Sequence, residues 1–515
     1  MASAWKTKSI IMAGGTRLDI EPVLRDAVAS GSLFDSQNIE SGEKGGYKRL
    51  KGYSLWESAV VPGTGRVLGC FVHNDGVLAC RGSAIYFSSG TGWGADIAPS
   101  SRAGALQYRA TKYIWSSGEC ITLVDGDNAP VRFIGAVGTN LTNAPVAATC
   151  VREFKNHLFF GKGGTVTFSA PDDDTTYTAG AGGGAFVIGD TIQNFAAWRD
   201  KLVIFCENSI HLLTGNDNGD FAIQALTGHT GCDFPDSVQE VGGDVVFSSP
   251  EGLRTISATV QTVELGLYAI SNPIKSFIRD SVEDFMSGRI CSTVVENKSQ
   301  YRLFFADEST AAASCPGVVA CLTAGQEGSS WEFFKSLGFK ASCADHGAIS
   351  SGADELVIHG DYDGYVYQQE SGDSFNTADI EAFFQLGYLV FDDPAIRKIY
   401  HRVRLYVEVE GGGIATLTGN LYLDDNDPDS LQPQPASLDL ISQISAQVAI
   451  YGFTGGSNGG SKYGTAVYGH GVGNNYRVGL VGAGFNMSLK IASSDTKPAW
   501  AIKTAIIEYS LGARQ

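Results

Sequence analysis

The 515-residue sequence has few charged residues for its length, and it has no long apolar run. Charged residues make up 18% of the chain and hydrophobic residues 43%, a balance that excludes an intrinsically disordered protein. No segment approaches the ~18 apolar residues of a membrane-spanning helix, and Ile10–Ala13 is too short for the core of a secretion signal. We therefore expect a folded protein that is made in a cytoplasm and is not inserted into a membrane.

The ten cysteines lack the spacing of a metal or redox site. No two of them lie two or three positions apart, as zinc-binding and dithiol motifs require. Most stand inside apolar runs such as Leu68–Phe71 and Ile204–Cys206, so we expect reduced cysteines in the core. The eight histidines show no ligand spacing either, and His211 and His401 are expected to be ordinary sheet residues.

Motifs of common active sites are also missing. The sequence has no Gly-x-Ser-x-Gly elbow, no P-loop and no His-Glu-x-x-His motif. Gly161–Thr165 is glycine-rich, but it lies between two strand-like runs and is interpreted as a hairpin turn. The sequence therefore predicts a protein that is not an enzyme, with no catalytic residue and no cofactor.

The net charge of −18 limits the kinds of partner. A protein that grips nucleic acid through the phosphates needs a basic surface, so a general DNA clamp is excluded. An acidic surface suits DNA that must slide past without sticking. The same charge would also simply keep a large assembly subunit soluble.

Glycine is abundant, with 64 residues, many of them in Gly-Gly, Asp-Gly and Asn-Gly steps between short apolar runs. Such steps supply the positive φ angles of hairpin turns, so the composition predicts many short strands. Strand–turn–strand units recur from about residue 60 to 260 and return after 290, at intervals of roughly 40–50 residues that are typical of propeller blades. A β-sandwich of similar hairpins is the alternative, and the repeats do not give a blade number.

These patterns predict a mostly β fold with three parts and a few short helices. Residues 1–55 form an N-terminal arm and the first strands, with a helix near 19–28, and residues 56–375 form the β-propeller with a helical insertion at about 272–287. Residues 376–515 form one or more additional β-sandwich-like domains, with a glycine-rich loop at 452–473.

An acidic stretch precedes a basic strand near the predicted domain boundary. Residues 345–393 contain eleven Asp or Glu and no Lys or Arg, and residues 397–407 alternate as a strand does. We hypothesise that this region supplies charges to a lumen or a subunit interface. The candidates are Asp354, Glu355, Asp361, Asp363, Arg397, Lys398, Arg402 and Arg404.

Two acidic clusters could bind a cation. Asp361 and Asp363 have the opening spacing of a calcium loop, although the later bidentate carboxylate is missing and a hairpin turn explains the same residues. Asp172–Asp174 are interpreted as a solvated loop tip.

Seven stretches, taken in their order, resemble a known family. They are Gly45–Tyr53, Asn156–Gly161 with Val166–Ser169, Ala197–Gly215, Gly228–Val238, Val246–Arg254, Tyr301–Phe305 and Ile506–Ser510. Each is a generic hairpin by itself, and the specificity lies in their succession. The chain thus resembles the tail nozzle, or packaged-DNA stabilisation, proteins of short-tailed phages. The stretches 424–435 and 452–473 have no counterpart in that family.

The resemblance implies a structural virion protein built around a β-propeller with additional β domains. Members form a homo-hexameric ring below the portal and adaptor proteins, which retains packaged DNA and conducts it during ejection. Implied partners are the adaptor and portal proteins, tail fibres or a tail needle, and double-stranded DNA in transient passage. The implied location is the tail of the virion, assembled in the host cytoplasm.

Two other function classes remain open at this stage. A carbohydrate-binding or glycosidase-type propeller of a tail tip would use surface aromatics such as Trp93, Trp198 and Trp331 to stack on sugars, although burial of these side chains is the expectation. A host scaffold propeller unrelated to phage is the third class.

Overall fold

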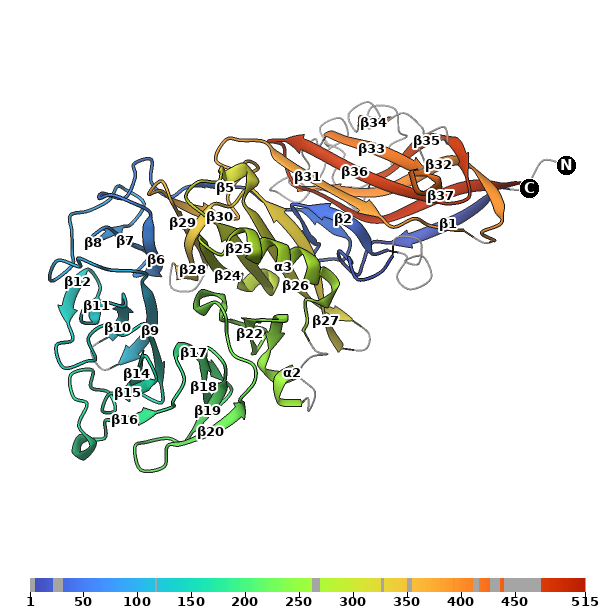
Figure 1. Ribbon diagram of the computed structural model, residues 1–515. Helices are drawn as coiled ribbons and strands as arrows, with labels where there is room; N and C mark the ends of the chain where they lie inside the picture. The colour runs from blue at the N-terminus through green and yellow to red at the C-terminus, as the bar shows by residue number, and fades with distance from the viewer. Residues whose placement is uncertain are drawn as a thin grey trace, which may run out of the picture. The chain divides into compact units, whose positions relative to one another are not determined.

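The computed structural model divides the chain into two compact units (Figure 1). Unit 1 comprises residues 1–52, 332–335 and 371–515, and unit 2 comprises residues 53–331 and 336–370. The structure describes residues 5–21, 31–115, 118–261, 269–325, 328–349, 354–391, 393–410, 416–426, 436–439 and 474–514.

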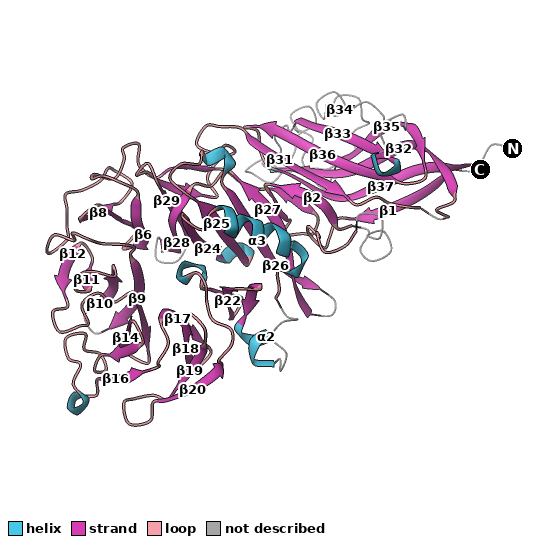
Figure 2. Cartoon of the chain, viewed as in Figure 1, coloured by secondary structure: helices cyan, strands magenta, loops and turns pink. Residues whose placement is uncertain are grey.

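The described residues of unit 2 form seven small antiparallel sheets in chain order, and strands dominate the chain (Figure 2). The first sheet contains β6 (Val67–His73), β7 (Gly76–Arg81) and β8 (Ala84–Ser88). The second contains β9 (Arg109–Trp115), β10 (Gly118–Val124), β11 (Val131–Ile134) and β12 (Val137–Asn140). The third contains β13 (Cys150–Phe154), β14 (His157–Lys162), β15 (Thr165–Phe168) and β16 (Gly184–Val187). The fourth and fifth are β17 (Ile192–Trp198), β18 (Lys201–Cys206), β19 (Ile210–Thr214) and β20 (Ala222–Thr227); and β21 (Gln239–Val241), β22 (Asp244–Ser249) and β23 (Gly252–Thr255). The last two are β24 (Arg289–Val295), β25 (Gln300–Ala306), β26 (Pro316–Gly325) and β27 (Gly328–Leu337); and β28 (Ala341–Ile349), β29 (Asp354–Asp361), β30 (Val366–Gln369) and β5 (Tyr53–Leu55).

The seventh sheet is completed by a strand from the beginning of unit 2. β5 pairs with β30, Leu55 opposite Tyr367, so the first and last segments of the unit share one sheet. The first and seventh sheets also touch directly, because the Ser342 hydroxyl donates a hydrogen bond to the Val67 carbonyl at 2.8 Å. The row of sheets therefore closes on itself.

Apolar layers join consecutive sheets. One buried cluster packs Phe71 and Leu78 of the first sheet against Ile121 and Phe133 of the second, and further clusters join the second to the third, the third to the fourth, the fourth to the fifth and the seventh to the first. Burial of each such side chain contributes about 1.5–3 kcal/mol. The second strand of a sheet is covered on both faces, which explains the unbroken apolar run of β18.

The hairpin turns follow from their residues. Asn74 and Asp75 both have positive φ between β6 and β7, and Lys155 and Asn156 do so between β13 and β14. Two successive positive φ angles are those of a type I′ turn, whose twist matches that of the strands. The Gly161–Thr165 segment joins β14 to β15, so its interpretation as a hairpin turn is confirmed.

The helices are few and short. The predicted helix at 272–287 is confirmed as the 3-10 turn η5 (Asn272–Ile274) followed by α3 (Lys275–Asp284), and α2 spans Ile256–Gln261. Among the described residues, the other 3-10 turns are η2 (Ala179–Ala181), η3 (Pro235–Ser237), η6 (Glu296–Lys298), η7 (Ala312–Ser314) and η10 (Asp424–Asn426). Among the described residues, no helix combines the length and apolarity needed to cross a membrane. The helix expected near 19–28 falls mainly outside the described residues, as does the loop at 452–473.

The described residues of unit 1 form two antiparallel sheets that contact each other through aromatic side chains. One contains β1 (Lys6–Ile11), β3 (Ile39–Ser41), β4 (Tyr47–Arg49), β37 (Trp500–Arg514), β32 (Ile396–Val409) and β35 (Asn474–Gly484), and the other contains β2 (Leu33–Gln37), β31 (Ile380–Leu386), β36 (Met487–Asp495), β33 (Thr416–Leu423) and β34 (Ala436–Asp439). Phe384 of β31 meets Tyr47 of β4 at 5.6 Å and Trp500 of β37 at 6.1 Å between ring centroids. Residues 1–52 are therefore not a separate arm, because their strands belong to the same sheets as the C-terminal strands.

The buried His359 makes the stability of unit 2 depend on pH. Burial, with a smaller contribution from Arg302, lowers the pKa of His359 from 6.5 to about 3. The Gln369 amide nitrogen can only donate, so the His359 Nδ1 atom 3.3 Å away accepts and the ring is neutral. Because the folded-state pKa is depressed, the full stabilisation is present above pH 6.5 and is lost as the pH falls toward 3.

We expect His359→Phe to remove this dependence. As the pH falls below 6.5, the free energy of unfolding of the parent protein should fall relative to that of the variant by up to ~1.4 kcal/mol per pH unit. Denaturant unfolding at several pH values measures it. A difference that stays constant from pH 7 to pH 4 would contradict the assignment.

Candidate functional site

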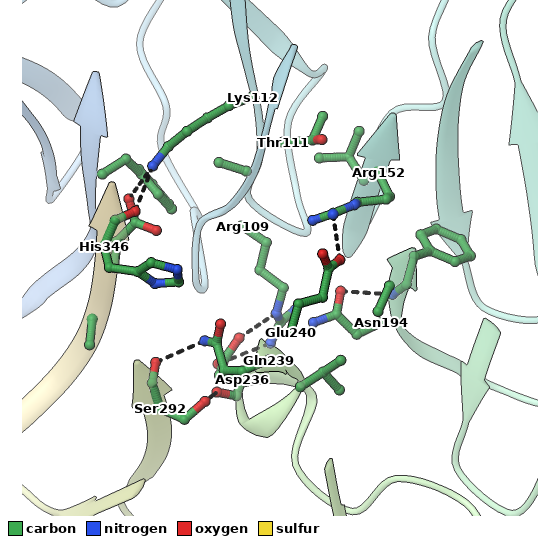
Figure 3. Close-up of a pocket in the computed structure, with 18 of the residues that line it drawn as sticks. Arg109, Thr111, Lys112, Arg152, Asn194, Asp236, Gln239, Glu240, Ser292 and His346 are labelled. Carbon is green, nitrogen blue, oxygen red and sulfur yellow. Dashed lines mark hydrogen bonds and ion pairs between the residues drawn. The ribbon is translucent and has the colours of Figure 1, made fainter. Parts of the chain in front are cut away.

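Unit 2 contains a cavity of about 560 Å³ at which all seven of its sheets meet. Each sheet contributes its first strand, and the fifth and sixth also contribute the turns η3 and η6 next to that strand. Charged and amide side chains from these strands point toward one another in the close-up of Figure 3. The convergence of seven strands makes this cavity the candidate functional site of the unit.

The centre of the cavity is crossed by an ion pair between Arg109 and Asp236. Arg109 lies on β9 in the second sheet and Asp236 lies in η3, just before the fifth sheet. The Arg109 Nε atom is 2.5 Å from Asp236 Oδ1, and Nη1 donates to the Thr149 carbonyl at 2.8 Å. Burial lowers the pKa of Arg109, but attraction to Asp236 outweighs it and holds the pKa above its ordinary value. The pair therefore ties two sheets that are not neighbours.

A second ion pair ties the third sheet to the fifth. Arg152 of β13 donates through Nη2 to the Glu240 carboxylate of β21. The same Glu240 oxygen accepts the Ala197 backbone N–H of β17 at 3.1 Å, so the carboxylate bridges three sheets. Figure 3 shows its contact with Arg152.

Two further contacts involve β28 of the seventh sheet. Lys112 of β9 donates to Asp345 at 2.8 Å, and Asp345 also accepts the Val72 backbone N–H of β6 at 2.8 Å. His346 lies 3.4 Å from Glu296 of η6. The hydrogen bond from His346 lowers the pKa of Glu296.

Amide and hydroxyl groups add neutral links around the same cavity. Asn194 donates to the Pro235 carbonyl at 2.7 Å. Gln239 donates to the Ser292 carbonyl at 3.0 Å, and the Ser292 hydroxyl donates to the Asp236 carbonyl at 2.7 Å (Figure 3). These bonds join the fourth, fifth and sixth sheets near the Arg109–Asp236 pair.

Most carboxylates of this cavity are paired with cations. A glycosidase needs one carboxyl group whose pKa is raised, opposite a second that stays ionised. Here Asp236, Glu240 and Asp345 each face a cation, and the pKa of Glu296 is lowered. The lining carries four Lys or Arg and five Asp or Glu, so the cavity is close to neutral and is not an acidic lumen.

The calcium candidates serve a hairpin turn. Asp361 is buried, and its Oδ1 atom accepts the backbone N–H groups of Asp363 and Tyr365 at 2.9 and 2.8 Å. Its Oδ2 atom accepts the Tyr367 hydroxyl, so the carboxylate braces the turn between β29 and β30. The Asp363 carboxylate lies 4.0 Å from Lys340. Among the described residues, no group of three or more His, Cys, Asp or Glu is arranged to hold a metal ion.

The other candidates of the acidic stretch lie away from the cavity lining. Asp354 is exposed at the start of β29. Glu355 accepts the backbone N–H groups of Glu296 and Asn297 at 2.6 and 3.1 Å. Asp345 and His346, which the sequence did not single out, are the residues of this stretch that reach the cavity together with Gly347.

The basic candidates of β32 have partners within their own unit. Arg402 and Arg404 both contact Glu508 of β37. Lys398 is buried and donates to the Asp393 carbonyl at 2.7 Å and the Phe485 carbonyl at 3.0 Å, and Arg397 donates to the Ala483 carbonyl at 2.9 Å. These contacts lie within one chain, and the expected pairing with acids of a neighbouring subunit stays a prediction.

The interpretation of Asp172–Asp174 as a solvated loop tip is wrong for Asp174, which is buried and pairs with Arg132 at 2.6 Å. The expected burial of the tryptophans is confirmed for one of the three. Trp198 is buried, whereas Trp93 and Trp331 are half-buried, and Trp93 donates to the Ala59 carbonyl at 3.0 Å. The expectation that the cysteines lie in the core is confirmed, since all ten are buried.

Sequence reasoning missed the cavity residues, although one signal was present. In several first strands charged or amide residues interrupt the apolar ones. Examples are Arg152 in Cys150–Phe154, Asn194 in Ile192–Trp198 and Asp345 in Ala341–Ile349. A polar side chain at the same place in successive repeats indicates a shared interior site.

Comparisons with known proteins show only distant structural likeness. No protein-family model matches the sequence, and no curated protein matches it. BBS1N, from the crystal structure of its complex with ARL6DN, aligns over 57% of this chain and 86% of its own with a TM-score of 0.34 and 10% identity. The AfRom2 CNH domain aligns over 63% and 99%, with a TM-score of 0.34 and 9% identity. The extracellular domain of the putative hybrid two component system BT4673 from B. thetaiotaomicron aligns over 74% and 44%, with a TM-score of 0.31 and 7% identity. Likeness at this level says nothing about what the chain does.

Proposed function

We propose that unit 2 is a seven-bladed β-propeller and that the chain is a structural subunit of the tail nozzle of a short-tailed phage. Three features support the propeller: the seven antiparallel sheets in chain order, the completion of the last sheet by β5, and the cavity lined by the first strand of every sheet. The two sheets of unit 1 supply the additional β domain.

One observation carries the proposal of a structural role: most of the charged groups of the central cavity are engaged with one another. Arg109–Asp236, Arg152–Glu240 and Lys112–Asp345 link sheets that are distant in the sequence. Such links rigidify a scaffold, and they leave these three carboxylates paired where a catalyst would need a free acid and base.

The resemblance to nozzle proteins specifies which structural role we propose. Its densest stretch, residues 192–257, covers the fourth and fifth sheets and includes Asp236 of the cavity. As a subunit of that family the chain would form a six-fold ring with copies of itself, attached to adaptor and portal proteins, and DNA would be held above it until ejection.

DNA would pass through the ring of subunits, not through a single chain. The central cavity of unit 2 holds about 560 Å³ and is crossed by the Arg109–Asp236 pair, so no duplex can enter it. The lumen of the proposed conduit must therefore be a surface formed between subunits. A net charge of −18 per subunit suits such a surface, because carboxylates do not hold phosphates.

Cryo-electron microscopy of purified virions and of the isolated protein tests this function. We expect the chain in a ring at the tail below the portal, with six-fold symmetry and an open central hole. A protein that stays monomeric and is absent from virus particles would refute the proposal. Turnover of an oligosaccharide by the purified chain would favour the carbohydrate-directed alternative.

A further inference from the structure

Two buried cysteines from the first and last sheets of unit 2 are in contact. Cys70 lies on β6 and Cys343 lies on β28, and their Sγ atoms are 3.5 Å apart. The residues are 273 positions apart in the sequence. Among the described cysteines, Cys70 and Cys343 are the pair whose Sγ atoms lie within hydrogen-bonding distance of each other. The pair therefore stands at the junction that closes the row of sheets.

The surroundings hold the two sulfurs in this arrangement. Gly360 of β29 provides the space for Cys343, because a Cβ atom at Gly360 would lie only 2.8 Å from the Cys343 Sγ. Next to it, the Ser342 hydroxyl donates to the Val67 carbonyl of β6 at 2.8 Å, and the Asp345 carboxylate accepts the Val72 N–H of β6 at 2.8 Å. The two strands are thus fixed to each other on both sides of the thiol pair.

We propose that Cys70 and Cys343 form a disulfide on exposure to a small disulfide oxidant, which locks the first sheet to the last. A disulfide places its sulfurs about 2.05 Å apart, so the sulfurs must approach by about 1.5 Å, which small rotations of the two side chains supply. This reaction does not depend on the proposed nozzle function. If that function is correct, the thiols stay reduced during assembly and meet an oxidising medium after release.

The exchange proceeds in two balanced steps. The Cys343 thiolate attacks a sulfur of the oxidant, which forms a mixed disulfide and releases one thiol. The Cys70 thiolate then attacks the Cys343 sulfur and displaces the second thiol. The two protein thiols lose two protons and two electrons in all, and the oxidant becomes two thiols.

The order of these steps follows from burial. Cys343 retains 5% exposure and Cys70 none, and both residues belong to the lining of the central cavity. Burial raises the pKa of the Cys70 thiol, which disfavours its thiolate. The reaction therefore begins at Cys343, from the cavity, and we expect it to be slow.

The test uses the full-length chain and bis(2-hydroxyethyl) disulfide as the oxidant. After incubation without denaturant, the protein is unfolded, alkylated and digested, and the peptides are identified by mass spectrometry. We expect a cross-linked pair that contains Cys70 and Cys343, loss of two of the ten titratable thiols, and reversal by dithiothreitol. Because the closed loop is long, the Tm of the oxidised protein should rise by roughly 5 °C.

Two variants separate this pair from general oxidation of cysteines. Cys343→Ala should keep every remaining thiol under the same conditions. Cys150→Ala removes an equally buried thiol and should still lose the same two thiols as the parent protein. Survival of all ten thiols in the parent protein, or cross-links spread over other cysteine pairs, would overturn the proposal even if a variant fails to fold.

Discussion

Replacing Asp125 with Ala should destabilise unit 2 by about 3–5 kcal/mol, because it leaves the buried Arg102 guanidinium without a counter-charge. The two side chains are 0% and 1% exposed. Arg102 donates to Asp125 through Nε at 3.0 Å and through Nη2 at 2.6 Å. The second Asp125 oxygen accepts the Asn128 backbone N–H at 2.7 Å, so one carboxylate holds both the arginine and the turn after β10.

Denaturant unfolding at neutral pH measures this effect, and Asp127 provides the matched control. Asp127 is exposed in the same turn, and Asp127→Ala should change the free energy of unfolding by less than ~0.5 kcal/mol. Exchanging Arg102 for Met in the Asp125→Ala background should recover much of the loss, since no unpaired charge then remains buried. Equal losses for Asp125→Ala and Asp127→Ala would show that the buried pair does not hold this part of the unit.

The local features of the fold could be predicted from the sequence because their causes are local. Gly161–Thr165 is interpreted as a hairpin turn from its glycines, and the helix predicted at about 272–287 has Pro273 in its first turn. The apolar run of β18 indicates a strand that is covered on both faces. The cysteines were assigned to the core from their apolar neighbours alone.

The long-range features could not be predicted because nothing near them in the sequence encodes the partner. The sequence places Tyr53 at the end of the glycine-bracketed stretch Gly45–Tyr53. In the structure Tyr53 begins β5, which is separate from β4 and pairs with β30, opposite residues more than 300 positions later. The charges of β32 looked like interface residues, because Glu508, which pairs with Arg402 and Arg404, lies about 100 positions further on and the alternation of one strand cannot reveal it.

The candidate site is still harder to predict from the sequence. Arg109 and Asp236 are separated by 127 positions, and only the closure of seven sheets brings them together. The acidic stretch 345–393 suggested a lumen, but Asp361 is used inside a hairpin and Asp345 faces a lysine. Composition therefore predicted charge, and the topology decided whether each charge is exposed, paired or buried.

Neutralising Asp236 should decide whether the central cavity braces the protein or catalyses a reaction. We expect Asp236→Asn to destabilise the protein by about 2–3 kcal/mol, because Arg109, only 16% exposed, loses its counter-charge. The paired variant Arg109→Met with Asp236→Asn completes a double-mutant cycle, whose coupling energy should exceed ~1 kcal/mol. The more exposed Arg152–Glu240 pair, at 34% and 43%, is the matched comparison and should couple more weakly, below ~1 kcal/mol.

The direction in which Asp236→Asn changes the free energy of unfolding distinguishes a brace from a catalytic site. Catalytic groups are held in arrangements that cost stability, so removing a catalytic carboxylate commonly makes a protein more stable. Removing a carboxylate that braces the fold should instead lower the free energy of unfolding, because the partner cation then lacks a counter-charge. Thermal and denaturant unfolding of Asp236→Asn give this sign directly, without any knowledge of a substrate. A stabilised variant would favour a carbohydrate-directed active site in the cavity, and a destabilised one supports a rigid scaffold whose working surfaces lie elsewhere on the chain.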